Sequence, residues 1–430
     1  MNNILAVLDV PNTAFMLLCT SLVMLMTPGL AFFYGGLVSR KSVITIMSQS
    51  FFSMGWVAII WFVVGYSLSF GPSINGIVGD PFYYAFLNNI SPQTMYTGND
   101  GGLPILVHFG YQMMFAIITP ALITGAFANR VNFPAYLIFL TLWTLFVYAP
   151  FVHMVWSPDG IFAKWGVVDF AGGIVVHATA GFAAIASALY VGKRVVKSDG
   201  THNIPYIALG AALLWFGWYG FNAGSELQVN TVTVSAFITT DIAAAFAAIT
   251  WFIIERLHTG KPKLVGFLTG AVAGLATITP ASGYVSIGSA AIIGVIASIV
   301  CYTCVFLVRR HLDDALDVFG VHGIGGITGS ILVGVFASTV WNAKGPAGLI
   351  EGNGMQIVKQ TVAVVFTSIW SFVFTILILW IINKFTPVRV DQSAVGDNLD
   401  TVEFDTHIEK KQISYQIYYF LQFILIGGFI

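Results

Sequence analysis

The chain has 430 residues, of which 57% are hydrophobic and only 9% are charged, and its formal net charge is −1. Soluble domains carry about 25% charged residues, so this chain has too few to cover itself with a water-facing surface. The near-zero charge also offers no basic patch for nucleic acid. The composition therefore predicts an all-α polytopic membrane protein, because its apolar runs reach the roughly 20 residues that a helix needs to cross a bilayer.

Apolar runs separated by polar or turn-rich breaks predict about eleven membrane spans. The N-terminal stretch MNNILAVLDV lacks the positive residues of a signal peptide, so we interpret the run after it as a true span. The predicted spans are residues 12–37, 42–70, 104–128, 131–155, 167–192, 203–224, 234–257, 264–281, 284–308, 318–341 and 357–384. They form a membrane domain, residues 1–390, followed by a tail, residues 391–430.

Lys and Arg residues predict the orientation, because they collect in cytoplasmic segments. With the N-terminus outside, 15 of the 18 basic residues fall in inside segments, and only Lys164, Lys344 and Lys359 fall outside. The chain is thus predicted to be N-out and C-in, with a cytoplasmic tail. Residues 413–430 are apolar but short for a span, so they form either a twelfth span or a segment in the membrane interface.

Two histidines lie in apolar spans that are five spans apart. His177 follows Asp169 in DFAGGIVVHATAG, within the fifth span, and His322 follows Asp317 in LDVFGVHGIGGITGS, within the tenth. Two halves of five spans have opposite orientations, as in transporters built from inverted repeats, whose sites lie near the midplane. A final helix completes this 5+5 arrangement. Because a histidine at bilayer depth usually faces a cavity or a partner, the pair is a candidate pore site.

Other interpretations of these polar residues are open. Either histidine alone could be a core residue with a satisfied hydrogen bond. Metal binding is disfavoured, because two histidines without a cysteine or carboxylate motif make a poor zinc site. Cys19, Cys301 and Cys304 lie within apolar runs and are predicted to be small core residues. No nucleophile–base pair indicates an enzyme, and we expect no cofactor and no metal.

A series of motifs gives the chain a family resemblance. They are TPGLAFFYGGLV at 27–38, GAFANR at 125–130, HMVW at 153–156, DFAGGIVVH at 169–177, GWYGFNAGS at 217–225 and DDALDVFGVHGIGGITG at 313–329. In this order they resemble the ammonium transporter family (Amt/Mep/Rh), and most closely its microbial Amt-type members, over residues 12–390. The resemblance implies a homotrimer in the cell membrane, with one ammonium-conducting pore in each subunit.

The resemblance also implies the residues of an outer site that recruits the cation. Trp156 and Ser225 resemble its two main contacts. Phe115 is similar to the outer gate phenyl, which also lines that site, and Phe221 is similar to a second gate phenyl beneath it. Asp169 resembles a buried carboxylate that supports the site, and we expect it also to cap a helix by accepting backbone N–H bonds.

His177 and His322 resemble the paired histidines of the family's pore. An aromatic face attracts a cation by roughly 0.5–2 kcal/mol, whereas an apolar lumen makes a bare ion very costly. Ammonium, unlike potassium, donates hydrogen bonds and can lose a proton, so it can pass as ammonia, with or without its proton. The two histidines then supply the polar contacts on a dry path. Methylammonium is the expected competing analogue.

Two alternative functions are open. One is an ammonium sensor that conducts little; the sequence shows no output domain, which disfavours this alternative. The other is an Rh-like channel for neutral gases, which the aromatic recruitment residue Trp156 disfavours. A tail motif resembling GLDxxxHGE couples family members to neighbouring subunits and to PII-type regulatory proteins. Here DNLDTVEFDTHIEKK, residues 397–411, places His407 seven residues after Asp400 instead of four. A PII-type partner is therefore an open question.

Overall fold

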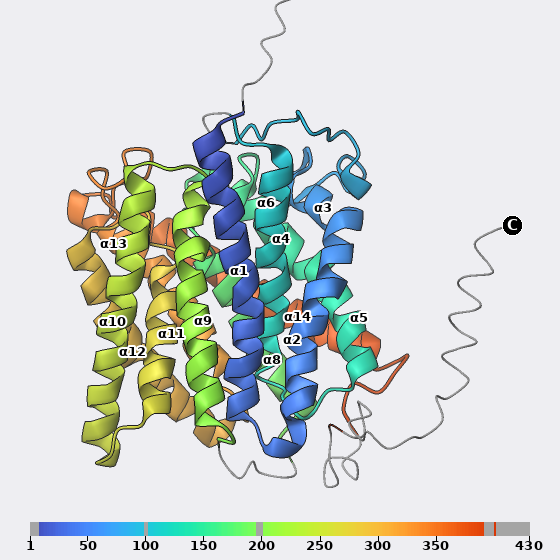
Figure 1. The fold of residues 1–430 in the computed structure, drawn as a ribbon, viewed down its shortest axis with the longest axis vertical. Coiled ribbons are helices and arrows are strands. Elements are labelled where there is room, and N and C mark those ends of the chain that lie inside the picture. The colour runs from blue at the N-terminus through green and yellow to red at the C-terminus, as the bar shows by residue number, and fades with distance from the viewer. Residues whose placement is uncertain (1–7, 99–101, 195–200, 391–399, 401–430) are drawn as a thin grey trace, which may run out of the picture.

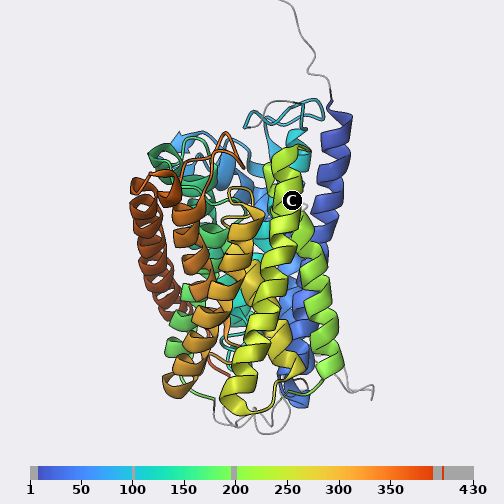
Figure 2. The same cartoon turned by 90° about the vertical axis from the view of Figure 1, so that its left-hand side faces the viewer.

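The computed structural model describes residues 8–98, 102–194, 201–390 and 400. Its long helices run side by side along one axis, as the two views in Figures 1 and 2 show. In chain order the helices are α1 (Val10–Leu37), α2 (Val43–Ile60), α3 (Tyr66–Phe70), α4 (Ile105–Ile123), α5 (Phe133–Trp143), α6 (Ala149–Trp156), α7 (Ile161–Trp165), α8 (Thr179–Val191), α9 (Ile204–Ala223), α10 (Thr231–Thr259), α11 (Leu264–Ile278), α12 (Ile287–His311), α13 (Ile324–Phe336) and α14 (Met355–Ile382).

Ten continuous helical segments in the described part of the chain are long and apolar enough to cross a membrane. The remaining predicted span, the eighth (residues 264–281), corresponds to α11, which is apolar but shorter. The prediction of an all-α polytopic membrane protein with about eleven spans is therefore confirmed. The strands are minor: β1 (Ser73–Ile74) and β2 (Val78–Gly79) form one antiparallel pair, with Ser73 opposite Gly79 and Ile74 opposite Val78.

Four of the membrane segments contain a π-helical turn, which adds one residue to a helical turn and is frequent at functional sites. Two of these turns join helices into one long segment: residues 61–65 join α2 to α3, and residues 144–148 join α5 to α6. The other two, Gly173–Ala178 and Phe319–Gly323, lead directly into α8 and α13. The sequence did not predict these turns.

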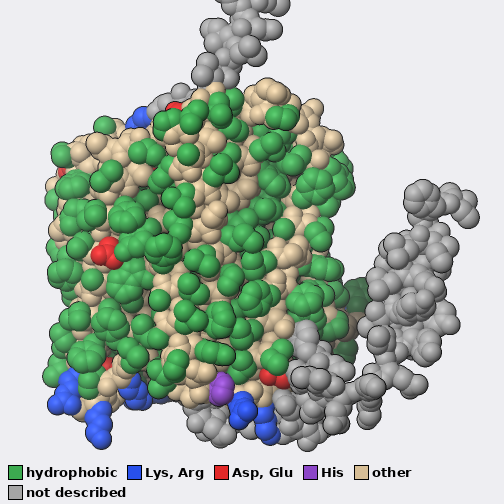
Figure 3. All heavy atoms as spheres, in the orientation of Figure 1, with side chains coloured by type: hydrophobic (Ala, Val, Ile, Leu, Met, Phe, Trp, Pro, Cys, Tyr) green, Lys and Arg blue, Asp and Glu red, His purple; other side chains and the backbone are tan. Residues whose placement is uncertain are grey.

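The outer surface of the bundle is apolar, as a lipid-facing surface requires. Large hydrophobic side chains such as Leu18, Ile59 and Phe216 are more than half exposed to solvent in the isolated chain. Most of the Lys and Arg side chains in view lie at the end of the bundle away from the start of α1 (Figure 3). This is the distribution that the N-out, C-in orientation requires.

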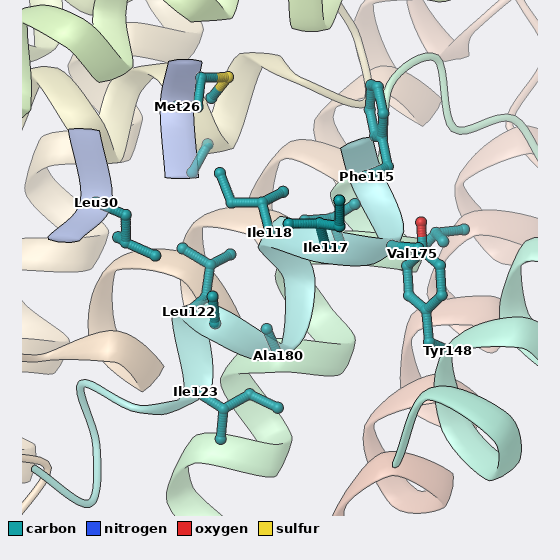
Figure 4. Packing of buried hydrophobic residues seen from close by; sticks show 14 of the residues in the cluster. Met26, Leu30, Phe115, Ile117, Ile118, Leu122, Ile123, Tyr148, Val175 and Ala180 are labelled. Atoms are coloured by element: carbon teal, nitrogen blue, oxygen red, sulfur yellow. The ribbon is translucent and has the colours of Figure 1, made fainter. Parts of the chain in front are cut away.

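Helix α4 lies deepest in the bundle. Of its most apolar stretch 83% is buried, compared with 33% for α12. Figure 4 shows Phe115, Ile118 and Leu122 of this helix among side chains from α1 and from the segment around α8. A helix that is buried on nearly all sides can contribute side chains to an internal path.

The tail is described at one position only. The carboxylate of Asp400 accepts hydrogen bonds from the backbone N–H groups of Ile44 (3.0 Å) and Thr45 (2.8 Å), at the start of α2. The division into residues 1–390 and 391–430 is not tested by this one contact. His407 and the apolar residues 413–430 lie outside the described residues.

Candidate functional site

The two predicted pore histidines lie side by side inside the bundle. His177 belongs to the π-helical turn before α8, and His322 belongs to the one before α13. Their Nδ1 atoms are 3.2 Å apart, and the rings are nearly parallel, with an interplanar angle of 20°. Both side chains are at most 5% exposed. The two rings are therefore buried and within hydrogen-bonding distance of each other.

Glycines allow the two histidine segments to cross at this distance. A Cβ atom on Gly181, in α8, would lie 2.1 Å from Cα of Gly323. A Cβ atom on Gly326, in α13, would lie 2.5 Å from the carbonyl oxygen of Gly173. Small residues let helix backbones approach closely in a membrane. The contacts are reciprocal, because a glycine of each helix meets the π-helical turn of the other segment.

Asp169 caps the segment that carries His177, as the sequence predicted. Its carboxylate accepts four backbone hydrogen bonds of 2.6–3.0 Å, from the N–H groups of residues 172–175. Gly172 has a φ of 118°, which favours glycine, and it turns the chain so that these N–H groups converge. The backbone carbonyl of Asp169 accepts a hydrogen bond from Nε1 of Trp156 (2.8 Å). Asp169 therefore holds both the histidine segment and the Trp156 ring.

The corresponding cap in the second half is Asp314, not Asp317. Asp314 accepts hydrogen bonds from the N–H groups of residues 318 (3.1 Å) and 319 (2.8 Å). It precedes His322 by eight positions, as Asp169 precedes His177. The sequence interpretation took Asp317 as the counterpart of Asp169, but Asp317 forms an ion pair with Arg309 instead. Matching Asp317 with Asp169 in the sequence was therefore wrong, because it took the aspartate nearest to His322 and ignored the spacing between aspartate and histidine.

The predicted gate residues form a stack above the histidines. The rings of Phe115 and Phe221 lie 4.2 Å apart between centroids, at an angle of 27°. Trp156 meets the edge of Phe115 at 5.8 Å and 86°. Below, the ring of His177 is 6.1 Å from that of Phe221. The structure thus brings five of the seven predicted site residues into one continuous series, from Trp156 through the phenyl rings to the histidines.

Ser225 lies next to Phe221, just after the end of α9. Its Oγ donates a hydrogen bond to the carbonyl oxygen of Phe221 (2.8 Å) and lies 3.3 Å from the hydroxyl of Tyr111. The single hydroxyl proton of Tyr111 is shared between the carbonyl oxygens of Gly220 and Phe221, each 2.9 Å from the hydroxyl oxygen. The hydroxyl proton of Ser225 is therefore used within the protein, which leaves its oxygen lone pairs as acceptors.

Three cavities follow one another along the bundle, and we name them by the predicted orientation. The outer vestibule, about 470 Å³, is bordered by Phe115, Trp156, Asp169 and Ser225. A narrow chamber of about 10 Å³ is bordered by Phe221, both histidines and mainly apolar side chains. The inner vestibule, about 600 Å³, begins at His322 and contains most of the nearby charged side chains. The narrow chamber has room for about one water-sized molecule.

Two further residues were missed at the sequence level. Trp218 stacks on His177, with a centroid distance of 5.6 Å and an angle of 22°, and its Nε1 donates to Oγ1 of Thr279 (2.9 Å). Tyr111 holds the end of α9 as described above. Trp218 lies within the motif GWYGFNAGS, but its apolar surroundings gave no signal that its ring would face the histidine. In the described residues no group of three or more His, Cys, Asp or Glu side chains could hold a metal ion.

These features define a multi-pass helical membrane protein in which two vestibules are separated by stacked aromatic rings and a narrow chamber with two histidines. The pattern of the Ammonium Transporter Family matches residues 14–408. An ammonium transporter of Aquifex aeolicus is 45% identical over 390 residues, covering 90% of each chain. Mep2 of Saccharomyces cerevisiae superimposes with a TM-score of 0.83 at 31% identity, covering 91% of this chain and 92% of Mep2. A solved protein described as a sensor Amt protein has a TM-score of 0.83 at 28% identity and covers 91% of this chain and 98% of that chain.

The chain belongs to the ammonium transporter family. It is a multi-pass protein of the cell membrane; its composition predicted the membrane spans, and the family resemblance predicted the cell membrane. The family is one of transporters and not of enzymes, in agreement with the sequence interpretation.

Proposed function

We propose that this protein transports ammonium by recruiting the cation in the outer vestibule and passing ammonia through the narrow chamber, with or without its proton. The observation that carries the proposal is the series Trp156, Phe115, Phe221, His177 and His322, which leads from the outer vestibule to the inner one. Family membership supports the same cargo. No metal and no cofactor are needed for any step.

Recruitment uses Trp156 and Ser225, and Phe115 closes the floor of the site. The indole N–H of Trp156 is already bonded to the backbone of Asp169, so the ring face is what the residue presents to a cation. Such a face is worth roughly 0.5–2 kcal/mol. Ser225 adds an oxygen acceptor for an ammonium N–H, since its own proton is donated to Phe221.

Asp169 acts on the cation without touching it. Both of its carboxylate oxygens are occupied by backbone N–H groups, and the residue is 5% exposed. Its negative charge still favours a cation at the floor of the vestibule, where charges are less screened than in bulk water. Asp169 is therefore a positioning residue that also supplies charge.

The narrow chamber selects against ions. A desolvated ion with apolar walls around it is strongly disfavoured, whereas ammonia is neutral and small. Nε2 of His177 is buried and has no hydrogen-bond partner among the described residues, so it can bond to an ammonia molecule in the chamber. The Nδ1 contact between His177 and His322 offers a path for the proton that ammonium leaves behind. Potassium has no proton to lose and is excluded.

We also propose that the protein assembles as a homotrimer with one pore in each subunit, as the family resemblance implies. Light scattering or mass measurement of the purified protein in detergent tests this. A mass of one or two subunits under all conditions would contradict it.

Flux through reconstituted liposomes tests the function. We expect ammonium gradients to drive transport and potassium gradients to drive none, and we expect Trp156→Ala to raise the half-saturating ammonium concentration by about 2- to 30-fold, the range that 0.5–2 kcal/mol sets. Methylammonium should compete with ammonium at this site.

The same measurement separates the alternatives. A sensor, the second candidate suggested by the similar sensor Amt protein, would bind ammonium but show no flux. A neutral gas channel would show flux that depends on ammonia alone and is insensitive to Trp156→Ala. Either result would replace the proposal.

A further inference from the structure

The outer vestibule contains a second acidic residue, Glu226, which directly follows Ser225. Helix α9 ends at Ala223, and a short turn, Gly224–Glu226, follows it. Leu227 then has a φ of 59°, which reverses the chain direction. Both Ser225 and Glu226 border the vestibule of about 470 Å³.

The carboxylate of Glu226 is held in place by neutral donors. Its Oε1 accepts hydrogen bonds from Nε2 of Gln228 (3.1 Å) and from Nδ2 of Asn230 (2.8 Å). Asn230 is itself fixed, because its Oδ1 caps α10 by accepting from the N–H groups of residues 232 and 233. No ion pair neutralises Glu226 among the residues that the structure describes. The carboxylate is therefore an anchored negative charge.

Glu226 differs from Asp169 in the access that it gives to a cation. Asp169 is buried, and its two oxygens share four backbone donors. Glu226 is only partly buried, and both recorded hydrogen bonds go to one of its oxygens. Its other oxygen keeps its acceptor capacity. Among the described residues that border the vestibule, Lys344 carries a positive charge, which opposes that of Glu226.

We propose that Glu226 is an electrostatic capture residue, which concentrates small monovalent cations in the outer vestibule and delivers them to Trp156 and Ser225. Lys344 lowers this effect. The inference rests on the proposed function and adds to it the residue that sets substrate capture at low concentration. A carboxylate attracts any small cation, so Glu226 adds capture but no selectivity, which is left to the narrow chamber. Charges inside a cleft act this way because its low-dielectric walls focus the field.

Methylammonium uptake into liposomes, measured at two ionic strengths, tests this. Glu226→Gln removes the charge and keeps the shape and hydrogen-bonding capacity of the side chain. At about 0.01 M salt, where charges act over about 30 Å, we expect roughly a three- to tenfold rise in the half-saturating concentration. This is below the roughly 10- to 1000-fold enrichment of a whole charged cleft, because only one charge is removed. The maximal rate should stay the same. At about 1 M salt, where the range falls to about 3 Å, the difference should largely vanish. Lys344→Gln should shift the half-saturating concentration in the opposite direction.

Asp159→Asn is the matched control. Asp159 forms an ion pair with Lys164 (2.8 Å) in the same outer region and borders a separate surface hollow, so its loss should leave uptake unchanged. Glu226→Asp keeps the charge and should keep the salt dependence, which covers the case in which Glu226→Gln folds poorly.

Besides an unchanged half-saturating concentration for Glu226→Gln, two results would overturn the inference. One is a rise in the half-saturating concentration for Glu226→Gln that persists at high salt. The other is a lower maximal rate with unchanged half-saturation. Trp156→Ala separates this failure from that of the proposed function: if Trp156→Ala weakens capture and Glu226→Gln does not, only the role of Glu226 is wrong. If neither variant changes capture, the recruitment site itself is wrong.

Discussion

The segments that carry His177 and His322 are built from the same parts but face different vestibules. In each, an aspartate eight positions before the histidine caps a π-helical turn. The first cap, Asp169, borders the outer vestibule, and the second, Asp314, borders the inner one. The similarity follows from the plan of two inverted halves, in which the same local structure serves opposite ends of one path.

The difference lies in the charges around the two caps. Asp169 is surrounded by backbone N–H groups, and no ion pair for it is found among the described residues. On the inner side, Asp313 is paired with Arg194 (2.6 Å) and Arg130 (3.7 Å), and Asp317 is paired with Arg309. The outer cap is therefore held by neutral donors, in a vestibule that Lys344 also borders, whereas two of the inner aspartates are paired directly with arginines. We therefore propose that this capping structure recruits cations at the outer end only.

The largest expected effect comes from removing the two caps. Asp169→Ala leaves four buried N–H groups without a partner, and each costs about 1–3 kcal/mol. Asp314→Ala leaves two. We expect Asp169→Ala to lower the free energy of unfolding so far that no folded protein remains. Asp314→Ala should lower it by roughly half as much, because it leaves half as many N–H groups without a partner. Expression and thermal unfolding in detergent measure both. Equal effects would show that the caps do not differ as described.

A smaller effect is expected at the crossing of the two segments. Gly181→Ala places a Cβ atom 2.1 Å from Gly323 backbone, which cannot move without displacing a histidine segment. Overpacking of this kind costs about 1–3 kcal/mol. Gly55→Ala is the control, since a Cβ atom there meets nothing within 4 Å. We expect the unfolding temperature to fall for Gly181→Ala and to stay or rise for Gly55→Ala. A fall of equal size in both would refute the close crossing.

The smallest effect concerns the pH dependence of the inner cap. Burial, together with the charge of Asp317, raises the pKa of Asp314 from 3.8 to about 7. The folded protein then binds more protons than the unfolded chain between about pH 4 and pH 7, so stability falls as pH rises through this window and levels off above it. Asp314→Asn should remove roughly 1 kcal/mol of this pH-dependent loss of stability. The value is smaller than the full pKa shift of Asp314 would give, because the adjacent vestibule screens the charge. Unfolding temperatures at pH 5 and pH 8 measure it. Identical slopes in parent and variant would contradict the shift.

The spans and the histidine pair could be predicted because they depend on long apolar runs and on rare polar residues within them. The π-helical turns around His177 and His322 could not, because hydropathy does not report the hydrogen-bonding register of a helix. Asp314 could have been found from its spacing of eight residues to His322. Glu226 could not, because the sequence does not show that the turn after α9 borders a vestibule.

We propose that His177 and His322 together carry ammonia through the narrow chamber while ions are rejected. The most direct measurement is the current and flux of His177→Ala and His322→Ala in liposomes, with ammonium and potassium gradients applied in turn. His258→Ala is the matched control, since His258 is exposed and bonds to Tyr302 outside the pore. We predict that each pore variant loses ammonium transport or loses its rejection of potassium, while His258→Ala behaves like the parent. If both pore variants carry ammonium at the parent rate and still reject potassium, the histidine pair is structural and the account is wrong.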